Sequence, residues 1–145
     1  MADRVRRPKQ YDEMLSLLKE QKNIFPTLKD AIVFAACLGL SRDKHMSFEK
    51  TSEPINMQTF GGEFDQMVFD VIGILASDDD PMIMAKERSD ERVRIFEEYA
   101  CGGLEIINHE VFQGGADVED GLIRLVLEEQ KDDSILSEIT NLSEV

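Results

Sequence analysis

The distribution of hydrophobic positions singles out the stretch from Phe25 to Leu40, which is apolar on almost every side. Its only charged residues, Lys29 and Asp30, lie in its first turn, and a helix without a solvated face is normally buried. Thr27 is a good N-cap, and Asp30 three residues later is placed to complete a capping box. Gly39 suits the residue after the last helical turn. The pattern predicts a buried central helix.

Apolar residues elsewhere recur at spacings of three and four, which is typical of amphipathic helices. This pattern predicts helices over residues 8–22, 63–76, 91–112 and 118–130, and a helix of one or two turns at 81–85. In the second of these, a continuous apolar stripe is formed by Phe64, Met67, Val68, Val71, Ile72 and Leu75. Gly102 and Gly103 fall inside the longest helix, where each costs about 1 kcal/mol relative to alanine. Either a close approach of another helix or a local bend must compensate, and we favour the close approach.

Between residues 44 and 59 the period changes from helical to alternating, which indicates a short extended or hairpin excursion. Together these patterns predict a mainly α fold: a single-domain bundle of about five helices with this one excursion. The domain is expected to cover residues 1–131, with residues 1–7 as a basic, flexible arm. Residues 132–145 are expected to be an acidic, disordered tail.

Composition narrows the class of protein. The 145 residues are 42% hydrophobic, enough for one core, and no run of 18 apolar residues predicts a membrane span. The charged N-terminus lacks the apolar segment of a secretory signal. Cys37 and Cys101 lie in apolar helical patterns, which favours buried, reduced thiols. These features predict a cytoplasmic protein.

Charge is distributed unevenly about a net value of −14. Residues 1–50 hold ten Lys and Arg against seven Asp and Glu, whereas residues 51–145 hold six against twenty-three. Since nucleic acid is attracted by positive potential, only the first third is suited to contact DNA. The candidate DNA-contacting residues are Arg4, Arg6, Arg7, Lys9, Lys29, Arg42, Lys44 and Lys50, with His45 beside them. Salt bridges to the acidic remainder are an equally good reading of these cations.

Evidence for catalysis or metal binding is weak. The run Asp78–Asp80 offers oxygen ligands to Mg²⁺ or Ca²⁺, but consecutive aspartates before Pro81 are more typical of a solvated turn and helix cap. Cys101 and His109 are about two turns apart on one helix, too far for a direct bond. No GxSxG and no phosphate-binding loop occurs. The sequence predicts a non-enzyme with no metal and no cofactor.

Several segments, taken in order, resemble the small proteins called DNA phosphorothioation-associated protein 4, which are encoded with bacterial dnd modification and restriction genes. These segments are DRVRRPKQYDEM, IFPTLKDAIVFAACLGL followed by SRDK, EPINMQTF, GGEFDQMVFDVIGI and ERVRIFEEYACGGLEII, and they cover most of residues 3–127. The order of helices and glycines is also distantly similar to the Dnd system's E protein, a small helical DNA-binding component.

The resemblance implies a non-catalytic role in phosphorothioate DNA modification or the associated restriction, which is a form of phage defence. Two readings follow. In the first, the protein is an adaptor or regulator that contacts the larger proteins of the system, and its acidic surface attracts a basic partner. In the second, it is a subunit that contacts duplex DNA through its basic N-terminal third. The glycine pair and the extended excursion are also compatible with a homodimer.

Overall fold

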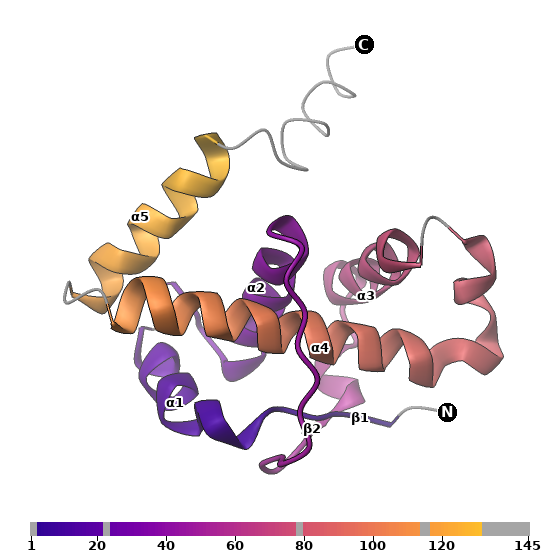
Figure 1. The fold of residues 1–145 in the computed structure, drawn as a ribbon. Coiled ribbons are helices and arrows are strands. Elements are labelled where there is room, and N and C mark those ends of the chain that lie inside the picture. The colour runs from indigo at the N-terminus through magenta and orange to yellow at the C-terminus, as the bar shows by residue number, and fades with distance from the viewer. Residues whose placement is uncertain (1–2, 22–23, 78–79, 114–116, 132–145) are drawn as a thin grey trace. The chain divides into compact units, whose positions relative to one another are not determined.

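The protein is described by a computed structural model over residues 3–21, 24–77, 80–113 and 117–131. Within these residues the α-helices are α1 Asp12–Glu20, α2 Leu28–Ser41, α3 Glu63–Ala76, α4 Ser89–Ile107 and α5 Val118–Lys131, and the strands are β1 Arg4–Val5 and β2 Ile55–Asn56 (Figure 1). Short 3-10 helices occur at Lys9–Tyr11, Met57–Phe60, Pro81–Met84 and Lys86–Arg88, and a π-helical turn, Asn108–Phe112, follows α4. The predicted mainly α fold of about five helices is confirmed.

The chain divides into two compact units, residues 1–104 and residues 105–145, with the boundary inside α4. The first unit contains the two strands, α1 to α3 and most of α4. In the second unit, α5 packs against the π-helical turn, and the space for a side chain at Gly121 is taken by Val111. The single domain expected over residues 1–131 remains a prediction, and the expected acidic tail, 132–145, lies outside the described residues.

Helix α2 begins as predicted. The Asp30 N–H donates to the Thr27 hydroxyl, and the Thr27 N–H donates to the Asp30 carboxylate at 3.1 Å, which completes the capping box. The predicted end at Gly39 is wrong, because the helix continues to Ser41. The left-handed residue that follows it is Asp43, with φ of 52°. Gly39 is needed for another reason: a Cβ there would lie 2.2 Å from the Tyr99 carbonyl oxygen.

The glycine pair of α4 allows a close approach, as predicted. A Cβ at Gly103 would lie 1.7 Å from the carbonyl oxygen of Ala35, so α2 and α4 cross almost backbone to backbone. A Cβ at Gly102 would lie 2.0 Å from the carbonyl oxygen of Lys44, in the segment that leaves α2. That segment runs across α4, where the Met46 N–H donates to the Glu98 carbonyl oxygen at 3.0 Å (Figure 1).

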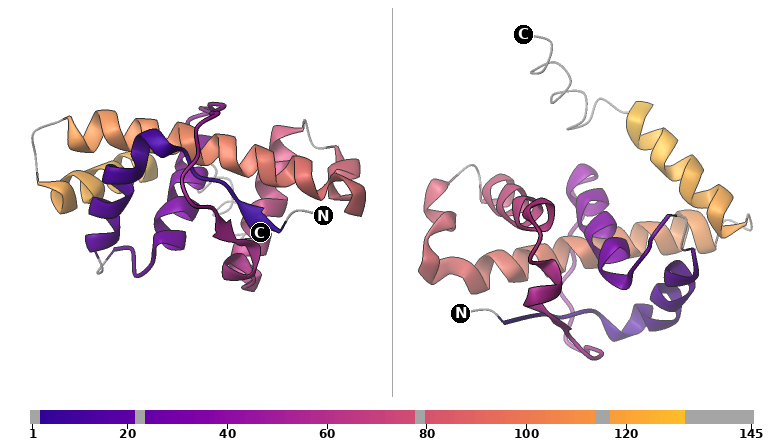
Figure 2. Two further views of the ribbon diagram at one scale, coloured as in Figure 1. Left: turned by 90° about the horizontal axis from the view of Figure 1, so that it is seen from below. Right: turned by 180° about the vertical axis from the view of Figure 1, so that it is seen from behind.

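The extended excursion is present, but its strand partner is unexpected. Strand β2 pairs in antiparallel register with β1 at the N-terminus, with Arg4 opposite Asn56 and Val5 opposite Ile55. A further antiparallel bridge joins Pro8 to Thr51. Figure 2 shows the N-terminal segment beside the chain that leads into β2 in both views. Val5 in this pair is completely buried.

Helix α3 has the predicted bounds but turns only part of its apolar surface inward. Val68 and Ile72 are buried together with Phe69, whose ring lies 4.1 Å from that of Phe96 on α4. Four members of the predicted stripe are instead exposed: Phe64, Met67, Val71 and Leu75. The aromatic contact with α4 therefore decides which side of α3 faces the core.

The predicted burial is correct for one of the two cysteines and wrong for the other. Cys101 is buried, as predicted, but Cys37 reaches the surface of α2, so its predicted burial is wrong. Partial desolvation by its neighbours still raises the pKa of the Cys37 thiol. None of the helices in the described residues is both long and apolar enough to cross a membrane.

Candidate nucleic-acid and partner surfaces

Arg6, a candidate for DNA contact, is bound to a carboxylate inside the protein. Its Nε and Nη2 donate to Glu97 Oε1 at 3.1 and 3.0 Å, and its backbone N–H donates to Glu97 Oε2 at 2.6 Å. The Glu97 side chain is only 4% exposed, so this carboxylate depends on Arg6 for compensation of its charge. The guanidinium also lies 5.3 Å from the centre of the Phe48 ring, within the range of a cation–π contact.

Arg7 is similarly engaged. Its Nε donates to the Glu53 carbonyl oxygen at 2.8 Å, and its Nη1 lies 3.3 Å from an Asp12 oxygen. Because strand β1 is paired and Val5 is buried, the N-terminal segment packs against the rest of the first unit. The flexible basic arm expected for residues 1–7 stays a prediction; in its described part, strand pairing and Glu97 both contact the segment.

Lys29 forms the third internal pair. Its Nζ donates to Asp65 Oδ2 on α3 at 2.8 Å, and the Asp65 side chain is buried. The hydrogen bond to Asp65 raises the pKa of Lys29, with further support from the charges of Asp65 and Asp30. Lys29 thus links the first turn of α2 to α3, and little of its charge is available to a phosphate.

The remaining candidates form no ion pair with a buried carboxylate in the described residues. Arg4 is exposed and contacts its neighbour Asp3 at 3.3 Å, a surface pair of small energetic value. Lys9 and Lys50 are exposed and adjacent, since the Lys9 N–H donates to the Lys50 carbonyl oxygen at 3.0 Å. Lys44 is exposed as well, and Arg42 is half-buried at the end of α2. Whether these residues contact DNA stays a prediction, and Arg6, Arg7 and Lys29 are the candidates that form ion pairs within the protein.

Of the run Asp78–Asp80, which was considered as a set of metal ligands, only Asp80 belongs to the described residues. Asp80 caps the short helix Pro81–Met84, as predicted, by accepting a hydrogen bond from the Met82 N–H at 3.0 Å. Its other oxygen pairs with Arg88 at 3.3 Å. Across the described chain, no three His, Cys, Asp or Glu side chains gather in a metal-binding arrangement.

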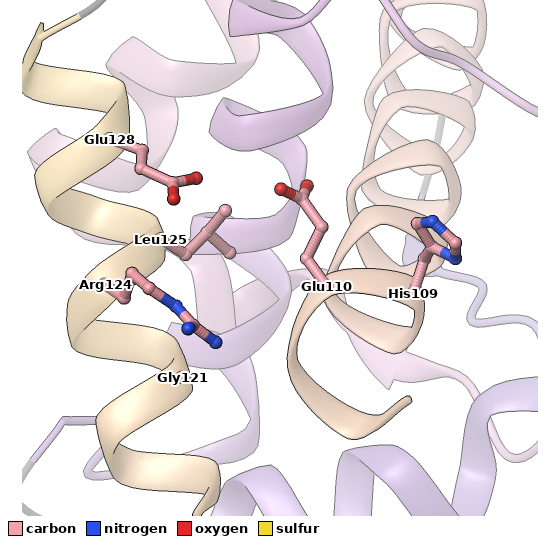
Figure 3. A pocket seen from close by; sticks show the side chains of 6 residues that line it. All are labelled: His109, Glu110, Gly121, Arg124, Leu125 and Glu128. Carbon is pink, nitrogen blue, oxygen red and sulfur yellow. The ribbon is translucent and has the colours of Figure 1, made fainter. Parts of the chain in front are cut away.

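The second unit has an open crevice of about 300 Å³. Figure 3 shows Glu110 on the π-helical turn pointing into the gap toward Glu128 and Leu125 on α5, while the ring of His109 points away from α5. The lining combines two carboxylates, one guanidinium and one imidazole around a single leucine. Because ligand sites are mostly apolar and enclosed, this shallow, mixed-charge crevice has the character of a solvated groove.

A feature that sequence reasoning missed is the outward side of α3. Phe64, Met67, Val71 and Leu75, which we call the α3 stripe, are each between 40% and 63% exposed. The sequence contained a signal for it: α3 is apolar on both of its long sides, with Phe69 opposite the stripe, so one core could not cover the whole helix.

Comparison with known families identifies the group to which this chain belongs. A family model described as DNA sulphur modification system-associated protein 4 matches residues 4–145. The protein is a member of this family. The match confirms the resemblance seen in the sequence and associates the protein with a DNA sulphur modification system. No curated protein and no solved structure matches the chain.

Proposed function

We propose that this protein is a non-catalytic accessory component of a DNA sulphur modification system and acts as an adaptor or regulator through protein–protein contacts. The observation that carries the proposal is that three of the candidate basic residues form ion pairs with acidic residues of the same chain. Arg6, Arg7 and Lys29 form ion pairs with Glu97, Asp12 and Asp65, so their charges are compensated within the protein. A net charge of −14 further disfavours a phosphate backbone and favours a basic protein partner.

The test combines partner capture with DNA binding. The tagged full chain is co-expressed with the other proteins of the system, and the expected result is a stable complex that weakens as salt rises. The same chain is then mixed with plain and phosphorothioate duplex DNA at low salt, where no shift is expected. Absence of any complex with the wild-type chain would refute the adaptor reading.

The competing DNA-contacting reading has its best support in the adjacent, exposed Lys9 and Lys50. Reversing Arg6 or Arg7 is an ambiguous test, because either change also removes an internal ion pair. The double substitution Lys9→Glu and Lys50→Glu reverses two exposed charges without breaking an ion pair found in the described residues. DNA binding by the wild type that this double variant abolishes would support the DNA-contacting subunit instead.

A further inference from the structure

The α3 stripe is a continuous apolar line on the surface of the first unit. Its members follow one another at spacings of three, four and four residues, so they lie on one side of the helix. Scattered exposed apolar side chains are normal in soluble proteins, but contiguous ones usually mark a binding surface. Four large side chains on one helix, all at least 40% exposed, meet that description.

The stripe cannot be buried by rotation of α3. The opposite side of the helix carries Phe69, which stacks on Phe96, and Asp65, which is buried and paired with Lys29. Rotating α3 to turn the stripe inward would move the Asp65 carboxylate away from Lys29 and remove Phe69 from the core. Breaking a buried ion pair is strongly destabilising, so the outward direction of the stripe is fixed.

The border of the stripe is acidic. Glu63 and Asp70 are seven residues apart, about two turns, and flank the stripe on one side. Helix α3 contains no lysine, arginine or histidine. The 3-10 helix Pro81–Met84 packs against α3 and exposes Met82 and Met84, whose unbranched side chains adapt to varied partners.

Two arginines lie beside that 3-10 helix, and the side chain of Arg92 packs at Gly73, about half a turn around α3 from Val71 and Leu75 of the stripe. Arg88 pairs with Asp80 and Glu91, at 3.3 and 2.8 Å. The guanidinium of Arg92 donates to the carbonyl oxygens of Ile83 and Ala85, at 2.6 and 2.9 Å. The surface therefore combines an apolar line with a negative border.

We propose that the α3 stripe is the docking site for an amphipathic helix of another protein of the same system, with an apolar line flanked by lysine or arginine. The inference rests on the proposed function and specifies its surface. When an amphipathic helix binds another protein, its apolar side chains at spacings of three and four make the contact. Complementary charges beside the apolar line then fix the orientation of the bound helix. A second copy fits poorly, because it would place one acidic border against another on chains that each carry −14.

A pair of synthetic probes tests the chemistry of the partner. One is an 18-residue helical peptide with a leucine line flanked by lysines, and the other has glutamates in place of the lysines. Fluorescence anisotropy with the full chain is expected to show binding of the lysine peptide, weakened by salt, and at least tenfold weaker binding of the glutamate peptide. Equal binding of the two peptides would overturn the charge argument.

Matched variants locate the site. Phe64→Gln with Met67→Gln is expected to lower affinity for the lysine peptide at least tenfold. Ile123→Gln with Leu127→Gln removes two comparably exposed side chains from α5 and is expected to leave affinity unchanged. If the control pair lowers affinity as much, binding is unspecific and the inference fails.

Two further readouts separate the alternatives. Light scattering is expected to show a monomer, and a dimer dissolved by the Phe64 and Met67 changes would assign the stripe to a second copy. The thermal midpoint of that variant is expected to match the wild type, and a large drop would show that the stripe is covered within the chain. In co-expression, a complex that survives the α3 changes would refute this surface while leaving the adaptor function standing.

Discussion

The crossing of α2 and α4 gives a sharp prediction, because it depends on the absence of one methyl group. In Gly103→Ala the new Cβ would lie 1.7 Å from the Ala35 carbonyl oxygen and 2.5 Å from its carbonyl carbon. Real Cβ atoms stay at least 3.0 Å from such atoms, so the helices must separate locally by at least the difference, 1.3 Å. The obstructing atoms belong to the backbone, and no change of side-chain rotamer relieves the contact.

Two opposing effects set the magnitude. Alanine gains about 1 kcal/mol over glycine from helix propensity. Overpacking a tight interface costs about 1–3 kcal/mol and more where the backbone must move, and separating two helices also loosens the side chains packed between them. We expect a net loss of about 2 kcal/mol or more in the free energy of unfolding, roughly a thirtyfold change in the folding equilibrium.

The assay is urea unfolding followed by far-ultraviolet circular dichroism, with Gly73→Ala as the matched control. Gly73 is also a helix-interior glycine, but a Cβ there would meet its nearest neighbour, the Arg92 side chain, at 3.4 Å. That contact is flexible, so the control is expected to gain up to about 1 kcal/mol from propensity. A Gly103→Ala protein that is as stable as the wild type, or more so, would refute the close backbone crossing.

Three other predictions test the ion pairs and thiols. Glu97→Ala is expected to lose about 1–3 kcal/mol in the free energy of unfolding and to speed tryptic cleavage after Arg6, since Arg6, next to strand β1, loses three hydrogen bonds. Asp65 raises the pKa of Lys29 in the folded state. The stability that Lys29 contributes is therefore complete below the ordinary lysine pKa of 10.5 and is lost as pH rises through the folded pKa. Urea unfolding at increasing alkaline pH should show that loss in the wild type and not in Lys29→Met. Iodoacetamide is expected to label Cys37 alone in the native protein, slowly at neutral pH and faster above pH 9, because its thiol pKa is raised.

Interactions that are local in the chain could be predicted from the sequence. The capping box of Thr27 and Asp30 joins residues three apart, and the bounds of α3 follow from a glycine before it and an uninterrupted helical period. The glycine pair of α4 indicated a close approach for a similarly local reason, because interior glycines weaken a helix unless packing compensates. It did not indicate which residue comes close, and Ala35 was identified only in the folded protein.

Ion-pair partners that are distant along the chain could not be predicted, as the candidate DNA-contacting residues show. Basic residues near the N-terminus look alike in sequence whether they face solvent or a buried carboxylate. Arg6 is neutralised by Glu97, ninety-one residues away along the chain, and Lys29 by Asp65, thirty-six residues away. Those pairings depend on how the helices pack.

The sequence by itself determined the helical class of this protein, the bounds of α3, the starts of α2 and α5, and its resemblance to a family associated with DNA sulphur modification, because periodicity, caps and segment order are properties of neighbouring residues. Tertiary structure alone decided which side of α3 meets the core and which cations are compensated. Helix α3 is apolar on two sides, so the choice was made by Phe96 and Lys29, both distant in the chain. That choice leaves the α3 stripe on the surface.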